Sequence, residues 1–143
     1  MREILFRGKR VDNGEWVFGN FIEDKWGDDN GNTIYAILQD RVAPDIAELW
    51  TPVRVIPETV GEYTGLTDKN GKKIFEGDIV NYVRMPKIYM IDFHEEFLHC
   101  SLFYYDKELK NIYYCGIVHK NDGKSIEVIG NIYDNPEFLR GEE

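Results

Sequence analysis

Cysteine, long apolar runs and basic charge are all scarce in this chain, and each shortage excludes a class of protein. The 143 residues include two cysteines, Cys100 and Cys115, too few for a disulfide framework. Both sit in apolar, aromatic runs, so we expect buried free thiols of a cytoplasmic protein. No apolar run approaches the roughly 20 residues of a membrane span, and the charged first ten residues do not resemble a secretory signal. No membrane partner is expected.

Basic residues are outnumbered, with 17 Lys and Arg against 26 Asp and Glu and a formal net charge of -9. Such a charge repels a phosphate backbone at long range, which disfavours nucleic acid as a partner. One weak basic cluster, Arg2, Arg7, Lys9 and Arg10 around Phe6, keeps a local nucleic-acid patch open as an alternative to a solvated strand face.

A sustained 3.6-residue apolar period is also missing, which excludes a mainly helical fold. Short alternating runs, a 14% aromatic content and regularly spaced turn signals instead predict a mainly β fold. Clear turns are expected at 12–14, 28–31, 68–71 and 121–123, and a strand break at 85–87. Little helix is expected: single turns near 45–48 and 57–59, and a terminal turn capped by Asn135. The predicted strands cover 4–10, 15–22, 33–38, 51–56, 61–65, 79–83, 88–93, 98–104, 112–118 and 125–133.

Metal-binding patterns are incomplete. His94 and His99 are five apart, whereas the zinc-protease pattern needs a spacing of four on a helix, and a spacing of five on one strand puts residues on opposite faces. Cys100 and Cys115, even with His99 and His119, lack the paired short spacing of structural zinc sites. The loops 28–31 and 68–71 lack the ligand pattern of calcium loops and are interpreted as turns. We therefore expect no metal site.

Catalytic and cofactor motifs are missing as well. The glycines form no phosphate-binding pattern, and no cysteine or histidine stands in a nucleophile motif. From the sequence we therefore expect no catalytic residue and no cofactor, and we expect that the protein is not an enzyme.

The segment Glu15–Ile22 is apolar on both faces. Trp16, Phe18 and Ile22 share one face, whereas Val17 and Phe21 lie on the other. A strand apolar on both faces needs cover on both. We interpret Trp16, Phe18 and Phe21 as a candidate interaction surface. Its cover could come from the rest of the chain, from a homo-oligomer or from a protein partner.

Three stretches together resemble the YopX-like family of phage and prophage proteins. They are ILFRGKR with NGEWVFG (4–10, 13–19), PETVGEYTGLTDKNGKKIFEGDIV (57–80) and EVIGNIYDNPE (127–137). The resemblance implies a β-rich fold with an SH3-like barrel component and a phage or prophage origin. It supplies no activity and no catalytic residues. Gly65, Gly71, Gly77 and Gly130 fit structural roles at turns and close strand crossings.

The expected organisation is an N-terminal β subdomain (1–56), an SH3-like β barrel (57–134) and a C-terminal tail (135–143). The leading functional hypothesis is a phage or prophage accessory protein in the cytoplasm of a bacterial host that acts as a protein-interaction module. The alternative is a nucleic-acid-associated protein that uses a barrel groove with exposed aromatics.

Overall fold

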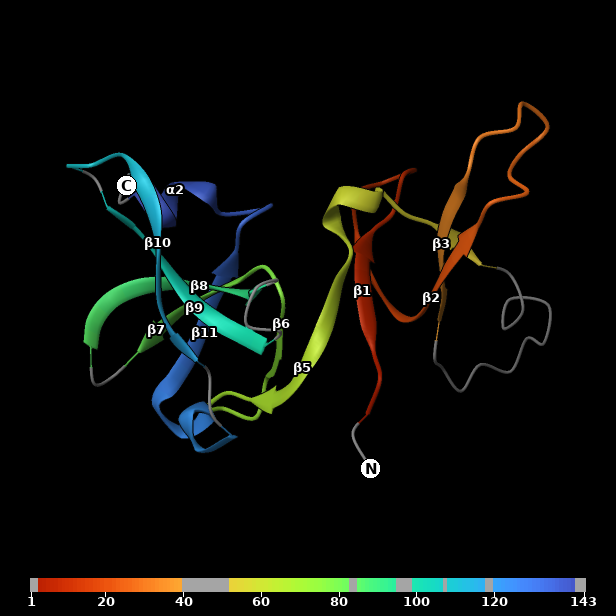
Figure 1. Ribbon diagram of the computed structural model, residues 1–143. Helices are drawn as coiled ribbons and strands as arrows, with labels where there is room; N and C mark the ends of the chain where they lie inside the picture. The colour runs from red at the N-terminus through yellow and green to blue at the C-terminus, as the bar shows by residue number, and fades with distance from the viewer. Residues whose placement is uncertain are drawn as a thin grey trace. The chain divides into compact units, whose positions relative to one another are not determined.

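The computed structural model describes residues 3–39, 52–82, 85–94, 99–106, 108–117 and 120–140, and it confirms a mainly β protein (Figure 1). The chain divides into a first unit, Met1–Tyr63, and a second unit, Thr64–Glu143. The strands are β1 (Phe6–Lys9), β2 (Trp16–Asp24), β3 (Ile34–Gln39), β4 (Val53–Arg54), β5 (Gly61–Thr67), β6 (Lys73–Phe75), β7 (Asp78–Tyr82), β8 (Met85–His94), β9 (His99–Asp106), β10 (Asn111–Ile117) and β11 (Ile126–Asn131). The helical elements described are two 3-10 helices, η1 (Pro57–Thr59) and η2 (Lys120–Ser125), and the α-helix α2 (Pro136–Arg140).

Successive hairpins build the sheet of the first unit. β1 pairs with β2, β2 with β3 and β3 with β4, all antiparallel, and the first residues of β5 lie on the other side of β1. The β1–β2 turn is the one predicted, because the side-chain Oδ1 of Asn13 accepts the N–H of Glu15 at 2.9 Å. A bridge between Arg10 and Val55 brings the segment after β4 alongside the end of β1.

The apolar core of the first unit lies on one face of this sheet. Val17, Ile37 and Val55 are buried. The half-buried side chains packed against them are those of Phe21, Tyr35, Val53 and Val60. Because side chains alternate along a strand, this face takes every second residue of β2 and β3. Each fully buried side chain of this size stabilises the fold by about 1.5–3 kcal/mol.

The second unit contains an antiparallel sheet in the order β10-β9-β8-β7-β11, and the rest of β5 pairs with β6. Tyr89 is 2% exposed, and its ring meets those of Tyr82 and Tyr104 edge-on, with centroids 6.5 and 6.4 Å apart. Edge-to-face rings at this separation attract one another beyond the effect of burial alone. The buried cluster around Tyr89 comprises Ile74, Val80, Ile91, Leu102 and Ile126.

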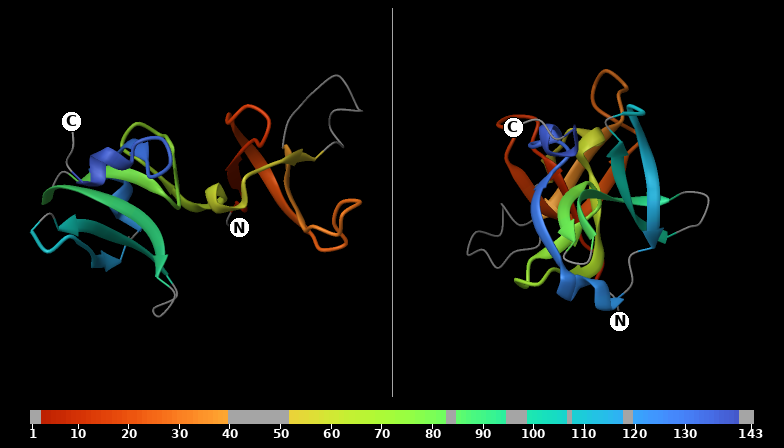
Figure 2. Two further views of the ribbon diagram at one scale, coloured as in Figure 1. Left: turned by 90° about the horizontal axis from the view of Figure 1, so that it is seen from above. Right: turned by 90° about the vertical axis from the view of Figure 1, so that its left-hand side faces the viewer.

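An SH3-like barrel was expected over 57–134, and the described strands of this range do not form a closed barrel. Closure requires the two outer strands of the order to pair with each other, whereas β10 and β11 stand at its opposite ends. Figure 2 shows these strands as a twisted layer. The residues expected as a tail include α2, which contacts β8 and β9.

Asp68 ties the turn after β5 to β11. Its side chain is buried, and its Oδ1 accepts the backbone N–H groups of Asn70 and Lys72 at 2.8 and 2.9 Å. Its Oδ2 accepts the N–H of Val128, sixty residues further along the chain, at 3.0 Å. The β7–β11 register shifts between Val128 and Gly130, and such a bulge disrupts the strand ladder locally. The carboxylate thus completes the hydrogen bonding at the bulge.

Residues 28–32 repeat the turn formed by residues 68–72. The Oδ1 of Asp28 accepts the N–H groups of Asn30 and Asn32 at 2.9 and 3.0 Å. In both turns the aspartate N–H also donates to the carbonyl four residues on, and the glycine N–H donates to the aspartate carbonyl. Both loops were predicted as turns, and both predictions are confirmed. The second oxygen of Asp28 stays within its own turn, facing the side chain of Asn32, whereas that of Asp68 bonds to a distant strand.

The end of β11 is braced by asparagines. The Oδ1 of Asn131 accepts the N–H of Asp134 at 2.9 Å, and the Oδ1 of Asn135 accepts the N–H of Asn131 at 3.3 Å. A Cβ atom at Gly130 would overlap the side chain of Asn135, so this close approach requires glycine. α2 begins at Pro136, as the sequence predicted.

The strand break predicted at 85–87 is wrong, because β8 begins at Met85 and includes Pro86. Proline cannot donate to the ladder, but it is tolerated at irregular positions. The β7–β8 register shifts between Asn81 and Tyr82, so the pairing is irregular at this end of β8. The helical turn expected near 45–48 lies outside the described residues.

The two equivalent turns give a matched test of what the bond to the bulge contributes. We expect Asp68→Asn to lower the free energy of unfolding by about 1.5–3 kcal/mol. An asparagine side chain has one oxygen, so it can accept either from the Val128 N–H or from the N–H groups of the turn. In either orientation its NH₂ group faces an N–H donor, and a hydrogen bond is lost. Asp28→Asn, the control, should cause a much smaller loss, since the hydrogen bonds of the Asp28 side chain to described residues close within its own turn. Urea unfolding measures both variants, and equal losses would contradict the assignment.

The same carboxylate makes stability depend on pH. Burial alone would raise the pKa of Asp68, but the N–H groups of Val128, Lys72 and Asn70 outweigh it and hold the pKa below its ordinary 3.8. Because the folded pKa is the lower one, this stabilisation is complete above about pH 5 and is lost as the pH falls through the folded pKa. The difference in unfolding free energy between wild type and Asp68→Asn should therefore be constant near neutrality and shrink in acid. A difference that persists unchanged to about pH 2 would count against this account.

Candidate interaction surface of the first unit

Two cations and two aromatic rings lie together on β1 and β2. The register pairs Arg7 with Phe18 and Lys9 with Trp16, and directly paired residues share a face of the sheet. The Cζ of Arg7 lies 4.6 Å, and the Nζ of Lys9 5.5 Å, from the centroid of the Trp16 ring. These distances are in the range of cation–π attraction. We call Arg7, Lys9, Trp16 and Phe18 the basic–aromatic face.

The members of this face differ in exposure. Arg7 is 6% exposed, Lys9 and Trp16 are half-buried, and Phe18 is 45% exposed. Arg7 is therefore the buried member of the face, and Phe18 is its most exposed ring.

Phe21 does not belong to this face. Its ring lies 5.8 Å from that of Phe6 and stacks 6.3 Å from that of Tyr35, on the side that carries the core. The three residues predicted as an interaction surface are thus divided. Trp16 and Phe18 lie on the basic–aromatic face, and Phe21 packs against the core of the first unit.

Trp26, which the sequence analysis did not single out, is the most exposed large apolar residue described, with 95% of its surface accessible. It lies in the loop 25–33 between β2 and β3, which we call the Trp26 loop. Figures 1 and 2 show from different sides that this loop extends beyond the ends of β2 and β3. Its polar neighbours hid the residue, because the sequence of this segment predicted only a turn at 28–31.

Hydrogen bonds fix the course of this loop. The Oδ1 of Asp24 accepts the N–H of Trp26 at 3.0 Å, and the Asp28 turn follows directly. Between them Gly27 has a φ of +74°, and a Cβ there would overlap the carbonyl of Asn32. Only glycine meets both conditions. The backbone therefore presents Trp26 to solvent in a defined position.

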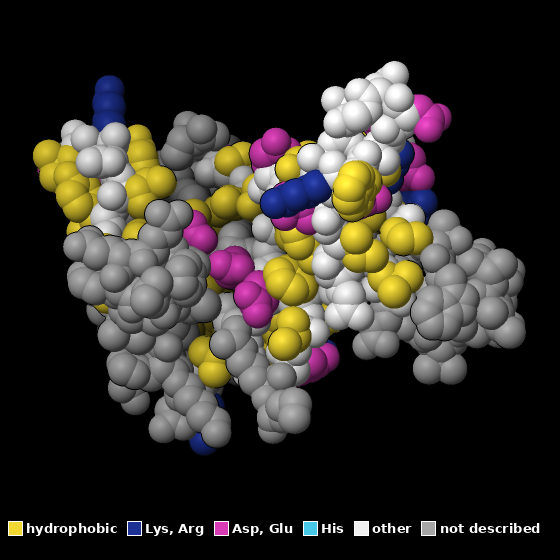
Figure 3. All heavy atoms as spheres, turned by 45° about the vertical axis from the view of Figure 1, so that its right-hand side comes forward, with side chains coloured by type: hydrophobic (Ala, Val, Ile, Leu, Met, Phe, Trp, Pro, Cys, Tyr) yellow, Lys and Arg dark blue, Asp and Glu magenta, His cyan; other side chains and the backbone are white. Residues whose placement is uncertain are grey.

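Acidic residues flank the tryptophan in the sequence. Four carboxylates, those of Glu23, Asp24, Asp28 and Asp29, fall within seven residues that hold one cation, Lys25. The N–H of Asn32 is the first of several groups that hold the pKa of Asp28 below its ordinary value, so Asp28 stays ionised at neutral pH. In Figure 3 acidic side chains lie beside this projecting loop.

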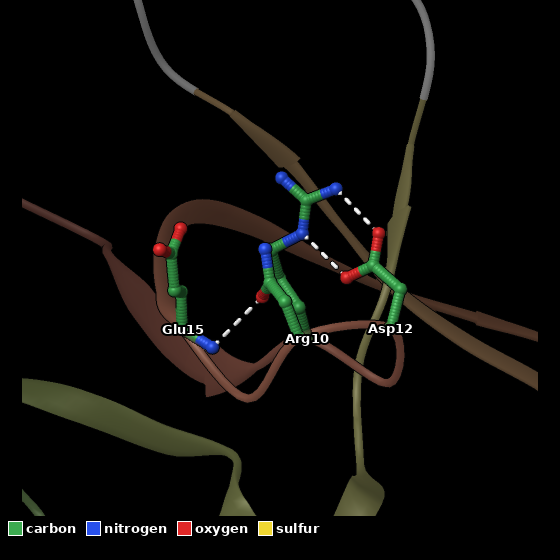
Figure 4. Close-up of polar contacts among 4 residues, drawn as sticks. Arg10, Asp12 and Glu15 are labelled. Atoms are coloured by element: carbon green, nitrogen blue, oxygen red, sulfur yellow. Dashed lines mark hydrogen bonds and ion pairs between the residues drawn. The ribbon is translucent and has the colours of Figure 1, made fainter.

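The basic cluster proposed from the sequence is smaller in the structure. Arg10 donates two hydrogen bonds to Asp12, from Nε at 2.8 Å and from a terminal nitrogen at 2.7 Å (Figure 4). This bond holds the pKa of Asp12 below its usual value. Arg10 is thus neutralised locally, and Arg2 lies outside the described residues. Of the four residues of the predicted cluster, Arg7 and Lys9 lie on the basic–aromatic face, over the ring of Trp16.

The histidine and cysteine candidates are also placed. β8 and β9 pair His94 directly with His99. The spacing argument, which treated the cases of one helix and one strand, therefore does not apply to this pair. Cys115 is exposed rather than buried, at the register shift of β10, whereas the side chain of Cys100 and all of His119 lie outside the described part of the chain. Across the residues that are described, no group of three His, Cys, Asp or Glu residues is arranged to hold a metal ion.

The described helices were compared with the length and apolar character that a membrane-spanning helix needs. None of the helices described is both long and apolar enough to cross a bilayer.

Comparison with known proteins gives one family and one fold. The family model described as YopX protein matches residues 5–140. A crystal structure of protein EF1440 from Enterococcus faecalis is similar with a TM-score of 0.54 and 23% identity, covering 97% of this chain and 99% of that one. At this identity the likeness concerns the fold. No curated protein matches.

The exposure of Trp26 can be measured by fluorescence quenching. Of the two tryptophans that the structure describes, Trp26→Phe should remove emission that acrylamide quenches strongly, whereas Trp16→Phe should remove emission quenched far less. Iodide should quench Trp26 less efficiently than acrylamide does, because the flanking carboxylates repel an anion. Equal loss of quenching in the two variants would show that Trp26 is shielded in solution.

Proposed function

The chain belongs to the YopX family, and within that family we propose that it is a protein-interaction module that acts by binding and not by catalysis. Neither match names an activity, a ligand or a partner. The family resemblance implies a phage or prophage setting, and with it the cytoplasm of a bacterial host. Binding is the role that the exposed aromatic side chains of the first unit support.

The observation that carries this proposal is the position of Trp26. A tryptophan that is 95% exposed contributes almost no burial to the fold. The backbone that carries it is nevertheless fixed by hydrogen bonds to Asp24 and Asp28 and by the close approach at Gly27. Tryptophan is enriched among residues that dominate binding energy, and a fixed backbone lowers the entropy that binding must overcome. An exposed tryptophan on a fixed backbone meets both requirements of a protein-binding anchor.

The basic–aromatic face favours a second candidate, a nucleic-acid-associated protein, because single strands are bound by cations beside stacking rings. Two observations weigh against it. Arg7 and Lys9 already lie over the ring of Trp16, which leaves Phe18 as the exposed ring of that face. The net charge of -9 also repels a phosphate backbone.

Site-specific photo-crosslinking tests the proposal. A benzophenone amino acid is placed at position 26 of the full chain, expressed in bacterial host cells, and the cells are irradiated. We expect a discrete protein adduct at position 26. The matched control is position 109, where Leu109 is 66% exposed in the second unit and where we expect no such adduct. Excess wild-type chain should compete for the adduct, and Trp26→Ala should not.

The outcomes separate the two candidates. A protease-sensitive adduct specific to position 26 supports the interaction module. A nuclease-sensitive adduct would replace that proposal with the nucleic-acid candidate, and anisotropy titration of a labelled single strand would then show binding lost in Phe18→Ala. No adduct at position 26, or equal adducts at both positions, would refute the proposed function.

A further inference from the structure

Asparagine is followed by glycine at three positions of the chain, Asn13, Asn30 and Asn70, and all three lie in exposed turns. Asparagine is a chemically labile residue. A following glycine favours its spontaneous deamidation, because no side chain hinders the approach of the glycine nitrogen. We propose that Asn30 is the deamidation site of the folded protein, and that its conversion loosens the Trp26 loop.

The reaction uses groups of the chain and water. The backbone nitrogen of Gly31 gives its proton to a base in the solvent and attacks the side-chain Cγ of Asn30. The side-chain nitrogen of Asn30 leaves as ammonia, and a succinimide ring remains. Water then opens the ring at either carbonyl group, which yields aspartate or isoaspartate. In isoaspartate the main chain runs through the former side-chain carbonyl and is longer by a methylene group.

Asn30 and Asn70 occupy the same place in turns of the same form. Gly31 has a φ of +79° and Gly71 has a φ of +80°. Each glycine N–H donates to the carbonyl of the aspartate that begins the turn, at 2.9 Å for Gly31 and 3.0 Å for Gly71. Because both glycine nitrogens are hydrogen-bonded, either reaction requires its turn to open locally.

The Asn70 turn is tied to β11. The Oδ2 of Asp68 accepts the N–H of Val128 at 3.0 Å. The backbone N–H of Lys69, the residue before Asn70, donates to the carbonyl of Ile126 at 2.9 Å. Opening this turn therefore breaks bonds to a distant strand as well as its own, and one of them has an ionised acceptor.

The Asn30 turn has no such tie within the described part of the chain. The carboxylate of Asp28 accepts the N–H groups of Asn30 and Asn32. The backbone of Asp28 bonds to that of Gly31 and Asn32. All these bonds close inside the turn. Its opening therefore costs less free energy, and the Gly31 nitrogen is released more often.

Asn13 is also held more firmly than Asn30. Its side-chain Oδ1 accepts the N–H of Glu15 at 2.9 Å, and the N–H of Gly14 donates to the carbonyl of Arg10 at 3.0 Å. The N–H of Arg10 donates to the carbonyl of Glu15 at 2.9 Å, which closes the β1–β2 hairpin. Release of the Gly14 nitrogen therefore opens the end of a paired hairpin, so we expect slow conversion there.

Conversion at Asn30 changes the loop that carries Trp26. The added methylene group of isoaspartate separates residue 30 from Gly31, so the bonds that join Gly31 and Asn32 to Asp28 no longer fit the turn. We expect the backbone on both sides of the turn to become looser. That this weakens binding by Trp26 rests on the proposed function, whereas the modification itself does not.

Peptide mapping of the aged full chain measures conversion at each site. The chain is incubated folded or denatured in mildly alkaline buffer and is then digested in acid, which stops the reaction. The denatured chain gives the rate that each local sequence allows, including the effect of neighbouring charges. Relative to that rate, Asn30 in the folded chain should convert at least about 10-fold faster than Asn70. Conversion of Asn70 or Asn13 as fast as that of Asn30 on this scale would overturn the proposal.

Asp68→Asn tests the cause of the difference. It weakens the tie between the Asn70 turn and Val128, so it should speed conversion of Asn70 several-fold and leave that of Asn30 unchanged. Circular dichroism confirms that the variant is folded. An unchanged rate at Asn70 would contradict the assignment of its protection to this tie.

Trypsin cleavage after Lys25, an exposed residue of the Trp26 loop, measures the loosening. The aged wild-type chain should be cut there several-fold faster than the fresh chain. Asn30→Gln, the matched control, keeps an amide but forms the larger ring far more slowly, so ageing should leave its cleavage unchanged. Equal cleavage of fresh and fully converted wild-type chains would refute the loosening. These measurements need no binding partner, so their failure is distinct from failure of the position-26 crosslink.

Discussion

A carboxylate that accepts backbone N–H groups at the second and fourth positions after it shapes a turn in each unit of this protein. At Asp68 the second carboxylate oxygen reaches across to Val128, so one side chain fixes a turn, a strand bulge and the pairing between distant segments. An ionised acceptor is suited to this role, because it takes several donors at once and forms stronger bonds than a neutral group does. The join between this turn and the bulge of β11 depends on this side chain remaining charged.

The same turn serves a different purpose at Asp28. Its hydrogen bonds close within the loop, and the loop is solvent-exposed rather than packed beneath a strand. The turn therefore does not join two parts of a core. It sets the direction of the chain beside Trp26, and a side chain with no folding role is held where a partner could reach it. One local pattern thus supports packing in one unit and presentation in the other.

Local chemistry explains which features could be predicted from the sequence. The Asn-Gly turns, the β1–β2 hairpin and the start of α2 at Pro136 depend on a few adjacent residues, so their signals are complete in the sequence. Features that depend on distant pairing were missed. The direct pairing of His94 with His99 requires the chain to reverse between them, and Pro86 is accepted in β8 through an irregular register with β7. The packing of Phe21 against the rings of Phe6 and Tyr35 likewise depends on how β2 pairs, and residue spacing alone does not show it.

The exposure of Trp26 has a consequence for how such a protein can diverge. Because this side chain packs against so little of its own chain, replacing it alters recognition at almost no cost to folding. Asp28 and Gly27, in contrast, are constrained by the geometry of the turn. A substitution at position 26 can therefore change binding specificity while the hairpin that carries it stays the same, so that related chains could acquire separate binding specificities through a single substitution.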